Sequence, residues 1–271
     1  MLVSLIIPTY KDLRALELIL EALIEQDYTN FEVIVAEDDN SQEVKAFLAS
    51  HEYPFKIHHF SHEDQGMRKA IAINQSIKLS QGEYLIFIDG DVIPYTSFIT
   101  SHVSLAEPKR VLCGRRVNLG DNVSTDIREG RSSALELQRS LLLKLPYLMK
   151  DNGRHFEQGL YFNPKGLIFK LLSQRDTNVH LLGSNFSLFK EDVLAINGVD
   201  EALYGGWNDF DIEWRLIASG TTPKTCKYSA NLFHLNHERH GRKERNQKQK
   251  AYIQEKRAQN TFYCQDGLQK V

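Results

Sequence analysis

The sequence predicts an α/β fold, with a Rossmann-like, mostly parallel central sheet flanked by helices and a mixed, less regular second half. In residues 1–95, short apolar runs alternate with segments whose apolar residues recur every three or four positions. Residues 84–88, YLIFI, form an unbroken apolar run, which is typical of a strand covered on both faces. Polar groups follow several of these runs at their carboxyl ends, where ligands bind in open α/β sheets.

The first half contains four expected strands and three expected helices. The strands are predicted at residues 2–7, 31–36, 55–60 and 84–88, and the helices at residues 12–26, 42–50 and 67–79. Asn40 or Ser41 can cap the second helix, and Gly82 ends the third. Strands and helices that alternate with short links specify right-handed crossovers and a parallel sheet, a nucleotide-binding type of half-domain. Neither GxGxxG nor GxxxxGK[ST] occurs, so a phosphate site would have to be built differently.

The second half is less regular. Helices are predicted at residues 95–105, 133–145 and 193–196, and from the GGWNDFD segment through Ser219. Pro146 is expected to end the second of these helices. Strands are predicted at residues 111–117, 180–189 and 225–235. Residues 118–126 are expected to form a polar loop, and residues 150–180 a flexible basic loop.

Composition indicates an ordinary globular chain in a reducing compartment. Of its 271 residues, 42% are hydrophobic and 25% charged, and the formal net charge of −2 argues against a general nucleic-acid binder. Cys113, Cys226 and Cys264 are widely spaced and form no CxxC pair, so neither a zinc site nor a disulfide framework is expected. No basic leader and no apolar run of about 18–20 residues is visible, which favours a cytoplasmic location.

The most informative chemistry follows the strand at residues 84–88. Asp89 and Asp91 flank Gly90, whose missing side chain lets the backbone turn. Paired hard oxygen ligands at this edge of a sheet indicate Mg²⁺ or Mn²⁺ carrying a phosphorylated substrate. A turn with two solvated acids is the alternative interpretation.

A second carboxylate, Asp209, lies at the amino end of the helix that opens near Trp207. It could act as the base that deprotonates an attacking hydroxyl, although aspartate at this position is also a common helix cap. His234 follows a predicted strand and could complete a metal site, in the company of His237, His240 and the more distant His180.

In this order the segments resemble the family-two inverting glycosyltransferases of the GT-A fold. The resemblance runs from residue 4 to about residue 237. It rests on IIPTYK, AEDDNS, DQGMRKAIAIN, IDGD, GSNFSLFKEDVLAINGVDE, GGWNDFDIEWRL and FHLNH. GGWNDFDIEWRL resembles the galactosyltransferase-type carboxyl-terminal motif GWGxEDxDLxxRL, with Asn208 where that motif has glutamate.

The resemblance implies a role for each matching position. Asp209 would be the catalytic base, and Asp89, Asp91 and His234 would hold Mn²⁺ or Mg²⁺. The donor-binding positions would be Pro8, Thr9, Asp38, Arg68, Asp89 and Gly90, and the sugar or acceptor positions would be Asn185, Trp207 and Asn208. Asp38 could accept the N3–H of uracil, which cytosine lacks, so a UDP-sugar is the expected donor.

The implied activity is metal-dependent, inverting transfer of a sugar to a glycan or glycolipid acceptor in surface polysaccharide or lipopolysaccharide synthesis. A non-catalytic nucleotide- or glycan-binding protein and a sugar-phosphate nucleotidyltransferase are the alternatives, although the latter's glycine- and lysine-rich signature is missing from the amino terminus. We expect one domain over residues 1–240, with a nucleotide-binding half (1–95) and an acceptor-binding half (96–240).

Residues 241–271 are expected to form a basic carboxyl-terminal helix or tail. Between residues 238 and 257 there are eight basic and three acidic residues, a net charge of +5. The tail could attract an anionic substrate or the inner face of a membrane, at about 1 kcal/mol per basic residue near lipid, or it could be a solvated helix.

Overall fold

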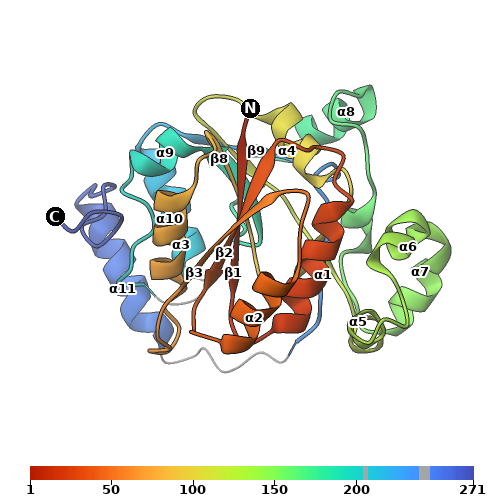
Figure 1. Ribbon diagram of the computed structural model, residues 1–271. Helices are drawn as coiled ribbons and strands as arrows, with labels where there is room; N and C mark the ends of the chain where they lie inside the picture. Colours follow the sequence, from red (N-terminus) through yellow and green to blue (C-terminus); the bar gives the residue numbers. More distant parts are fainter. Residues whose placement is uncertain (204–206, 238–244) are drawn as a thin grey trace.

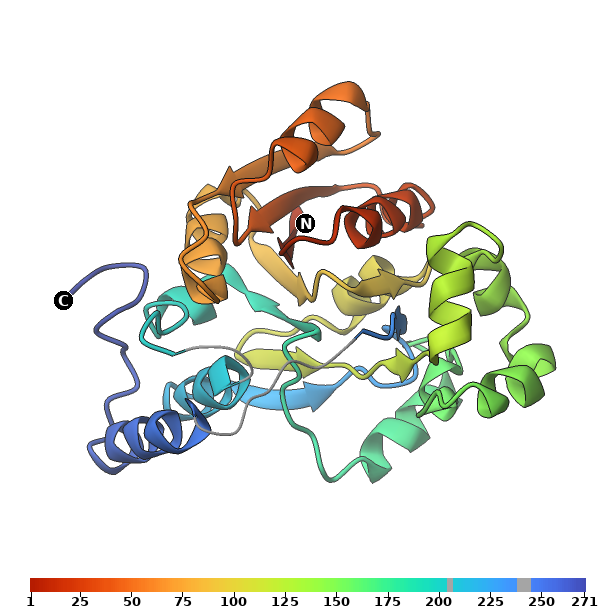
Figure 2. The same ribbon diagram turned by 90° about the horizontal axis from the view of Figure 1, so that it is seen from below.

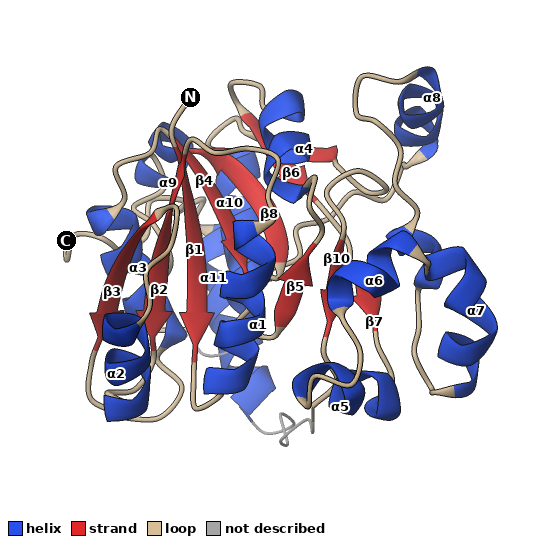
Figure 3. Cartoon of the chain, turned by 45° about the vertical axis from the view of Figure 1, so that its right-hand side comes forward, coloured by secondary structure: helices blue, strands red, loops and turns tan. Residues whose placement is uncertain are grey.

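The computed structural model describes residues 1–203, 207–237 and 245–271, and its centre is a seven-stranded sheet (Figure 1). The strand order is β3-β2-β1-β4-β8-β6-β9, and only β8 runs against the other six strands. A second sheet of three strands, β5-β10-β7, lies beside it (Figure 3). The predicted α/β class with a mostly parallel sheet is confirmed.

The elements follow one another with short connections in the first half. The strands are β1 Val3–Thr9, β2 Phe31–Glu37, β3 Lys56–Ser61, β4 Tyr84–Ile88, β5 Val92–Pro94, β6 Arg110–Cys113, β7 Val117–Asn118, β8 Asn185–Phe189, β9 Thr222–Thr225 and β10 Leu232–His234. The helices are α1 Leu13–Ile24, α2 Gln42–Ser50, α3 Lys69–Leu79, α4 Phe98–Leu105, α5 Asp121–Arg128, α6 Ala134–Arg139, α7 Leu141–Lys150, the 3₁₀ turn η1 Phe156–Gly159, α8 Leu167–Arg175, α9 Lys190–Leu194, α10 Trp207–Ala218 and α11 Arg245–Ala258.

The large sheet is buried on both faces because its strand residues alternate between two cores. Leu5 and Ile7 of β1 pack with α1, α2 and α4, whereas Ile6 between them packs with α3, α9 and α10. Figure 2 shows these helices on either side of the sheet. Because β4 is covered by helices on both faces, all of its side chains are buried, and its sequence is an unbroken apolar run.

The first half agrees closely with the prediction. β4 has the predicted bounds, and the side chain of Ser41 caps α2 by accepting from the backbone N–H groups of Glu43 and Val44. Asp12 caps α1 in the same way through the N–H of Ala15. Local periodicity and capping chemistry are sufficient to locate these elements, although the sheet pairs β1 with β4, which is distant in sequence.

Two predicted strands of the second half were wrong, and for one reason. The strand predicted at residues 111–117 is divided into β6 and β7, and that predicted at residues 225–235 corresponds to β9 and β10. In each case the first strand belongs to the large sheet and the second to the small one. In both segments the chain leaves the large sheet for the small one, and an apolar run in the sequence does not indicate such a change of sheet.

Three other expectations for this half were also wrong. Most of the polar loop expected at residues 118–126 belongs to α5, whose N–H groups at Asn122 and Val123 are capped by the carboxylate of Asp151, distant in sequence. Pro146 lies inside α7, and the break between helices falls at Ser140. The expected flexible loop at residues 150–180 contains η1 and α8.

The carboxyl-terminal segment is anchored to the domain. Ile253 of α11 is buried, and Leu268 joins the core beside α3 and α10. The side-chain amide of Asn197 donates to the carbonyl oxygens of Cys264 and Gln269 at 2.6 and 2.8 Å. Residues 245–271 therefore complete the packing of the second half.

α10 is held in place by a buried ion pair. Arg215 is 1% exposed, and its Nε lies 2.6 Å from Oδ2 of Asp211 one turn earlier. Nη1 of Arg215 also donates to the carbonyl oxygens of Ile196 and Gly198, each at 2.8 Å. Asp211 and Arg215 of the DIEWRL segment are therefore structural, and they fix the helix that carries Asp209.

We expect Arg215→Met to lower the free energy of unfolding by about 3–5 kcal/mol, because it leaves the carboxylate of Asp211 buried without its partner. Urea denaturation measures the difference. Arg110→Met is the control, since the exposed Arg110 lies 3.8 Å from Glu107 and its loss should cost about 0–1 kcal/mol. Equal losses in the two variants would contradict the assignment.

Candidate active site

The carboxyl ends of β1 and β4 meet at one edge of the sheet. A Cβ atom at Gly90 would lie 2.3 Å from the carbonyl oxygen of Pro8 and 3.2 Å from Cα of Thr9. Glycine is therefore required at position 90, because the backbone after β4 passes directly against the end of β1. This contact brings Pro8, Thr9 and Gly90, the predicted donor positions, together at one edge of the sheet.

A carboxylate and two imidazoles gather at the same edge. Oδ2 of Asp91 lies 3.3 Å from Nε2 of His234 and 3.0 Å from Nε2 of His237. One ligand atom from each of the three residues falls within 4.8 Å of the others. His234 reaches this position because β10 pairs with β5, which starts directly after Asp91, and the N–H of Leu235 donates to the carbonyl oxygen of Asp91 at 2.9 Å.

This cluster suits a divalent metal ion. Oδ1 of Asp91 is buried and has no hydrogen-bond partner among the described residues, so it is available as a ligand. Burial alone would raise the pKa of Asp91, but the hydrogen bonds from His234 and His237 outweigh it and hold that pKa well below its usual range. Two imidazoles and one carboxylate form a donor set for Mn²⁺ or a similar transition ion more than for Mg²⁺, which prefers oxygen ligands.

Asp89 has a different environment from the one expected. Its Oδ1 forms an ion pair with Nζ of Lys69, and its Oδ2 lies 3.7 Å from Nη1 of Arg116. Among the described residues the metal-type cluster comprises Asp91 and the two histidines, without Asp89. The pairing with Asp89 outweighs burial and raises the pKa of Lys69, so this side chain stays cationic.

Asp209 lies in the first turn of α10, beside the ion pair of Asp89 and Lys69. Its Oδ2 accepts a hydrogen bond from the N–H of Gly183 at 3.0 Å, and a Cβ atom at position 183 would lie 2.3 Å from its Oδ1. Burial raises the pKa of Asp209, with Asp89 acting in the same direction and Lys69 and Arg116 opposing it. Asp209, the predicted base, is therefore close enough to Asp89 and Lys69 for their charges to act on its pKa.

Asp38 is already engaged by the backbone. Both of its carboxylate oxygens accept from the N–H of Arg68, at 3.1 and 2.9 Å, so Asp38 fixes the residue that precedes α3. Burial raises the pKa of Asp38, although the N–H of Arg68 opposes the shift. Its neighbour Asp39 is 7% exposed, and Asp39 Oδ1 is buried without a hydrogen-bond partner among the described residues.

Asn185 lies opposite Ile88 at the carboxyl end of β4, but its side chain is enclosed by the protein. Its side chain is fully buried, and its amide donates to the carbonyl oxygens of Arg115 and Ala230 at 2.8 and 2.9 Å. Its Oδ1 lies 3.1 Å from Nε2 of His102. All hydrogen-bonding groups of this amide are used within the protein, so the structure gives Asn185 a structural role in place of the expected sugar contact.

The other predicted residues either lie elsewhere in the fold or fall outside the described residues. His180 pairs with Glu213 of α10 at 2.8 Å, away from the cluster around Asp91. The side chains of Trp207 and Asn208, and the whole of His240, lie outside the described residues, and so do Gly205 and Gly206 of the motif.

Sequence reasoning did not single out Lys69, Arg116 or Asp39, and it named His237 only as a companion of His234. Lys69 stands inside the DQGMRKAIAIN segment, and Arg116 follows β6 at the point where the chain changes sheets. A basic residue inside a matched segment could have been a signal for Lys69. No local pattern indicates that Arg116 approaches Asp89.

Fold and site together define an α/β protein of the GT-A type with a cluster suited to a metal ion at the carboxyl edge of its sheet. The chain belongs to glycosyl transferase family 2, whose profile matches residues 4–195.

Relatives and solved structures agree with this membership. Hyaluronan synthase from Pasteurella multocida is 24% identical over 82% of this chain, which covers 23% of that protein. S. aureus TarS superposes with a TM-score of 0.62 at 15% identity, covering 94% of this chain and 39% of TarS, and a fragment of it has been solved with UDP-GlcNAc. A mannosyltransferase from Pyrobaculum calidifontis, solved with GDP-Man and Mn²⁺, superposes with a TM-score of 0.56 at 17% identity, covering 88% of this chain and 57% of the other. The chain spans 13% to 23% of the length of the first curated relatives.

Metal binding should depend on Asp91 and not on Asp89 when no nucleotide is present. We expect Asp91→Asn to weaken Mn²⁺ binding by at least about 100-fold, since the carboxylate is the only anionic ligand of the cluster. Asp89→Asn is the matched control and should change the affinity by less than about threefold. Titration calorimetry with Mn²⁺ alone makes the comparison. Equal losses of Mn²⁺ affinity in the two variants would show that Asp89 also binds the metal.

Proposed function

We propose that this chain transfers a sugar from a nucleotide-diphosphate donor, a UDP-sugar, to a hydroxyl group of a glycan or glycolipid acceptor, with inversion at the anomeric carbon. The observation that carries the proposal is the position of Asp209. A partly buried carboxylate with a raised pKa stands within electrostatic reach of Asp89 and Lys69, and Asp89 is two residues from Asp91 of the cluster suited to a metal ion.

The donor would bind along the ends of β1, β2 and β4. Thr9 and Gly90 form the floor, and the acidic turn after β2 would receive the base of the nucleotide. Asp38 keeps its backbone contacts to Arg68, while Asp39 offers an oxygen without a partner among the described residues. Either carboxylate can accept the N3–H of uracil, which supports a uridine nucleotide.

The diphosphate would lie against the cations and the metal-type cluster. A divalent metal held by Asp91, His234 and His237 would neutralise charge on the departing diphosphate. Lys69 and Arg116, which flank Asp89, add two positive charges at the same place. Asp89 orients both cations and so prevents them from pairing with Asp209.

Proton transfer falls to Asp209. Its Oδ2 is held by the N–H of Gly183, and Gly183 lets the carboxylate lie close to the backbone. In the ionised form Asp209 accepts the proton of the acceptor hydroxyl as this oxygen attacks the anomeric carbon from the side opposite the diphosphate. Inversion follows from this single displacement.

The acceptor side is supported by the likeness of GGWNDFDIEWRL to the galactosyltransferase-type motif. Asp211 and Arg215 of that segment hold α10, so the helix presents its first turn to the site. We place Trp207 and Asn208 of this turn at the acceptor or transferred sugar. Growing surface glycans, including lipopolysaccharide and capsule, are the acceptors we propose.

A donor screen tests the function directly. We expect UDP release above background from one of a panel of nucleotide sugars in the presence of Mn²⁺, and weaker release with Mg²⁺. Chelation should abolish the release. UDP and Mn²⁺ binding without turnover of any donor would favour a non-catalytic nucleotide-binding protein.

Asp209→Asn should lower kcat by about 10²–10⁴-fold while UDP and Mn²⁺ affinities stay within about threefold, because the amide keeps the size of the side chain and cannot accept the proton. Asp126→Asn, which alters an acid on the surface, is the control and should leave kcat unchanged.

The pH profile adds a second readout of Asp209. A base acts only when unprotonated, and burial raises the pKa of Asp209. The rate should therefore fall on acidification at a pH above the ~3.9 of an ordinary aspartate. If Asp209→Asn retains turnover, or if the rate does not change on acidification, Asp209 is not the base.

A further inference from the structure

Two helices on one side of the molecule expose apolar side chains to solvent. Nearly half of the large apolar side chains that are exposed among the described residues lie between residues 142 and 171. On α7, Leu142, Leu143 and Met149 are 68%, 85% and 66% exposed. On α8, Leu167, Ile168 and Leu171 are 72%, 57% and 51% exposed. We call these six side chains the α7–α8 face.

The core does not account for this face. α8 buries only Phe169, and α7 buries only Leu141 and Leu148, so most apolar residues of both helices face outward. α7 and α8 both project from the same side of the domain in Figures 1 and 3. A cluster of this kind indicates an interaction surface, because single exposed apolar residues are ordinary but gathered ones are not.

The segment that carries the α7–α8 face is rich in basic residues. Residues 139–175 contain seven lysine and arginine residues and two acidic residues, a net charge of +5 in a chain whose net charge is −2. Six of the seven basic side chains are exposed, and none forms an ion pair with any residue in the described part of the chain. Of the two acids, Asp151 is buried as the cap of α5.

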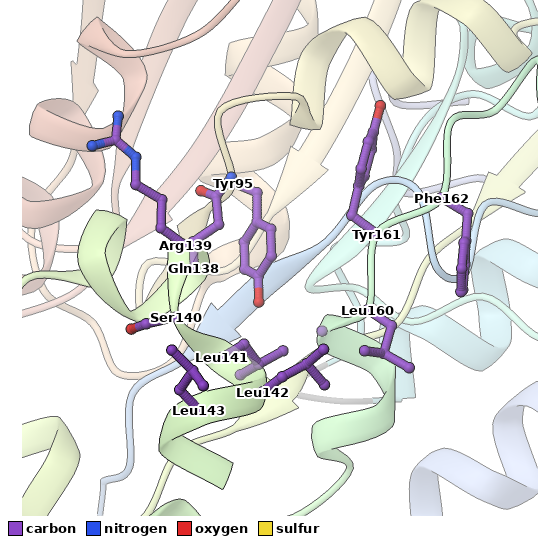
Figure 4. Close-up of a pocket in the computed structure, with 11 residues that line it drawn as sticks. Tyr95, Gln138, Arg139, Ser140, Leu141, Leu142, Leu143, Leu160, Tyr161 and Phe162 are labelled. Carbon is purple, nitrogen blue, oxygen red and sulfur yellow. The ribbon is translucent and has the colours of Figure 1, made fainter.

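A pocket of about 670 Å³ opens beside α7. Leu141, Leu142 and Leu160 line it, and Tyr95 directs its hydroxyl end toward the α7 leucines (Figure 4). Tyr95 is 2% exposed, and its hydroxyl oxygen has no hydrogen-bond partner among the described residues. Tyr95 directly follows β5, and β5 begins one residue after Asp91. The chain therefore leads from the candidate active site to the wall of the pocket within a few residues.

We propose that the α7–α8 face docks the protein on the interface of an anionic lipid bilayer. The leucines enter the boundary between headgroups and acyl chains, and the surrounding lysines and arginines lie against lipid phosphates. The pocket beside α7 accommodates hydrocarbon from the same layer. The attachment is interfacial, since no helix in the described ranges is long and apolar enough to cross a bilayer.

The positive charge of this face favours an anionic membrane over a second copy of the chain as its binding partner. A two-fold dimer through this face would set the same patch against itself and bring unpaired cations of both copies together. An anionic surface provides the opposite charge. The basic carboxyl-terminal helix α11 lies on the other side of the domain from α7 (Figures 1 and 2), so it does not share this surface.

Vesicle co-sedimentation of the full chain, without donor or metal, tests the proposal independently of sugar transfer. We expect binding to vesicles of phosphatidylcholine with phosphatidylglycerol, and at least tenfold weaker binding to pure phosphatidylcholine or at 1 M salt. Leu143→Gln with Leu167→Gln should weaken binding at least tenfold. The matched control, Ile24→Gln with Leu194→Gln, alters equally apolar exposed residues elsewhere and should have no effect.

The charge variants complete the test. Lys165→Gln with Lys170→Gln should weaken binding at least fivefold, whereas Lys56→Gln with Lys78→Gln should not. No binding to anionic vesicles, or losses of equal size in the controls, would overturn the proposal. So would a loss confined to Lys248→Gln with Lys250→Gln on α11, or a wild-type dimer that Leu143→Gln with Leu167→Gln converts to monomer in light scattering.

Discussion

The antiparallel pairing of β5 with β10 is the constraint on which the candidate site depends. The N–H of Leu235 donates to the carbonyl oxygen of Asp91, and the register sets His234 opposite Val92. Backbone hydrogen bonds therefore place an imidazole from the far end of the chain beside a carboxylate from the first half. Gly90 adds the other half of the constraint, because only a residue without a Cβ atom lets this turn lie against β1. A side-chain cluster positioned by two backbones is preorganised for a metal ion, which reduces the cost of ordering its ligands.

The two acids around Gly90 have separate sets of partners at this edge of the sheet, and we call these two sets layers. Asp91 is matched by the two histidines, whereas Asp89 is matched by Lys69 and Arg116. Asp209 stands next to Asp89 and its two cations. The N–H of Gly183 holds it, it forms no ion pair with any of the described residues, and burial raises its pKa. A diphosphate with a divalent metal would enter between the layers and use the cations that Asp89 now holds. One acid can thus organise cations while a neighbouring acid remains a base, because their surroundings differ.

Most elements of the first half could be predicted, because each one has its own period of apolar residues. Periodicity locates β1 to β4 and α1 to α3 within a few residues. Residue type and position predict Asn40 or Ser41 as the cap of α2, and the structure shows that it is Ser41. The second half could not be read in this way. Asp151 caps α5 from a distance, and the chain passes between two sheets after Cys113 and again after Thr225. Long-range pairing of this kind has no period in the sequence.

The sequence by itself determined the fold class, the family and the types of residue at the site: the two acids around Gly90, a histidine near residue 234 and an acid at the start of α10. Spacing along short segments carries that information. Only the tertiary structure decided how these residues divide their roles. It separated Asp91, with two histidines, from Asp89, with two cations, and it enclosed Asn185 in the core. Which partner a carboxylate meets depends on strands that come together from distant parts of the chain, and that is decided when the sheets form.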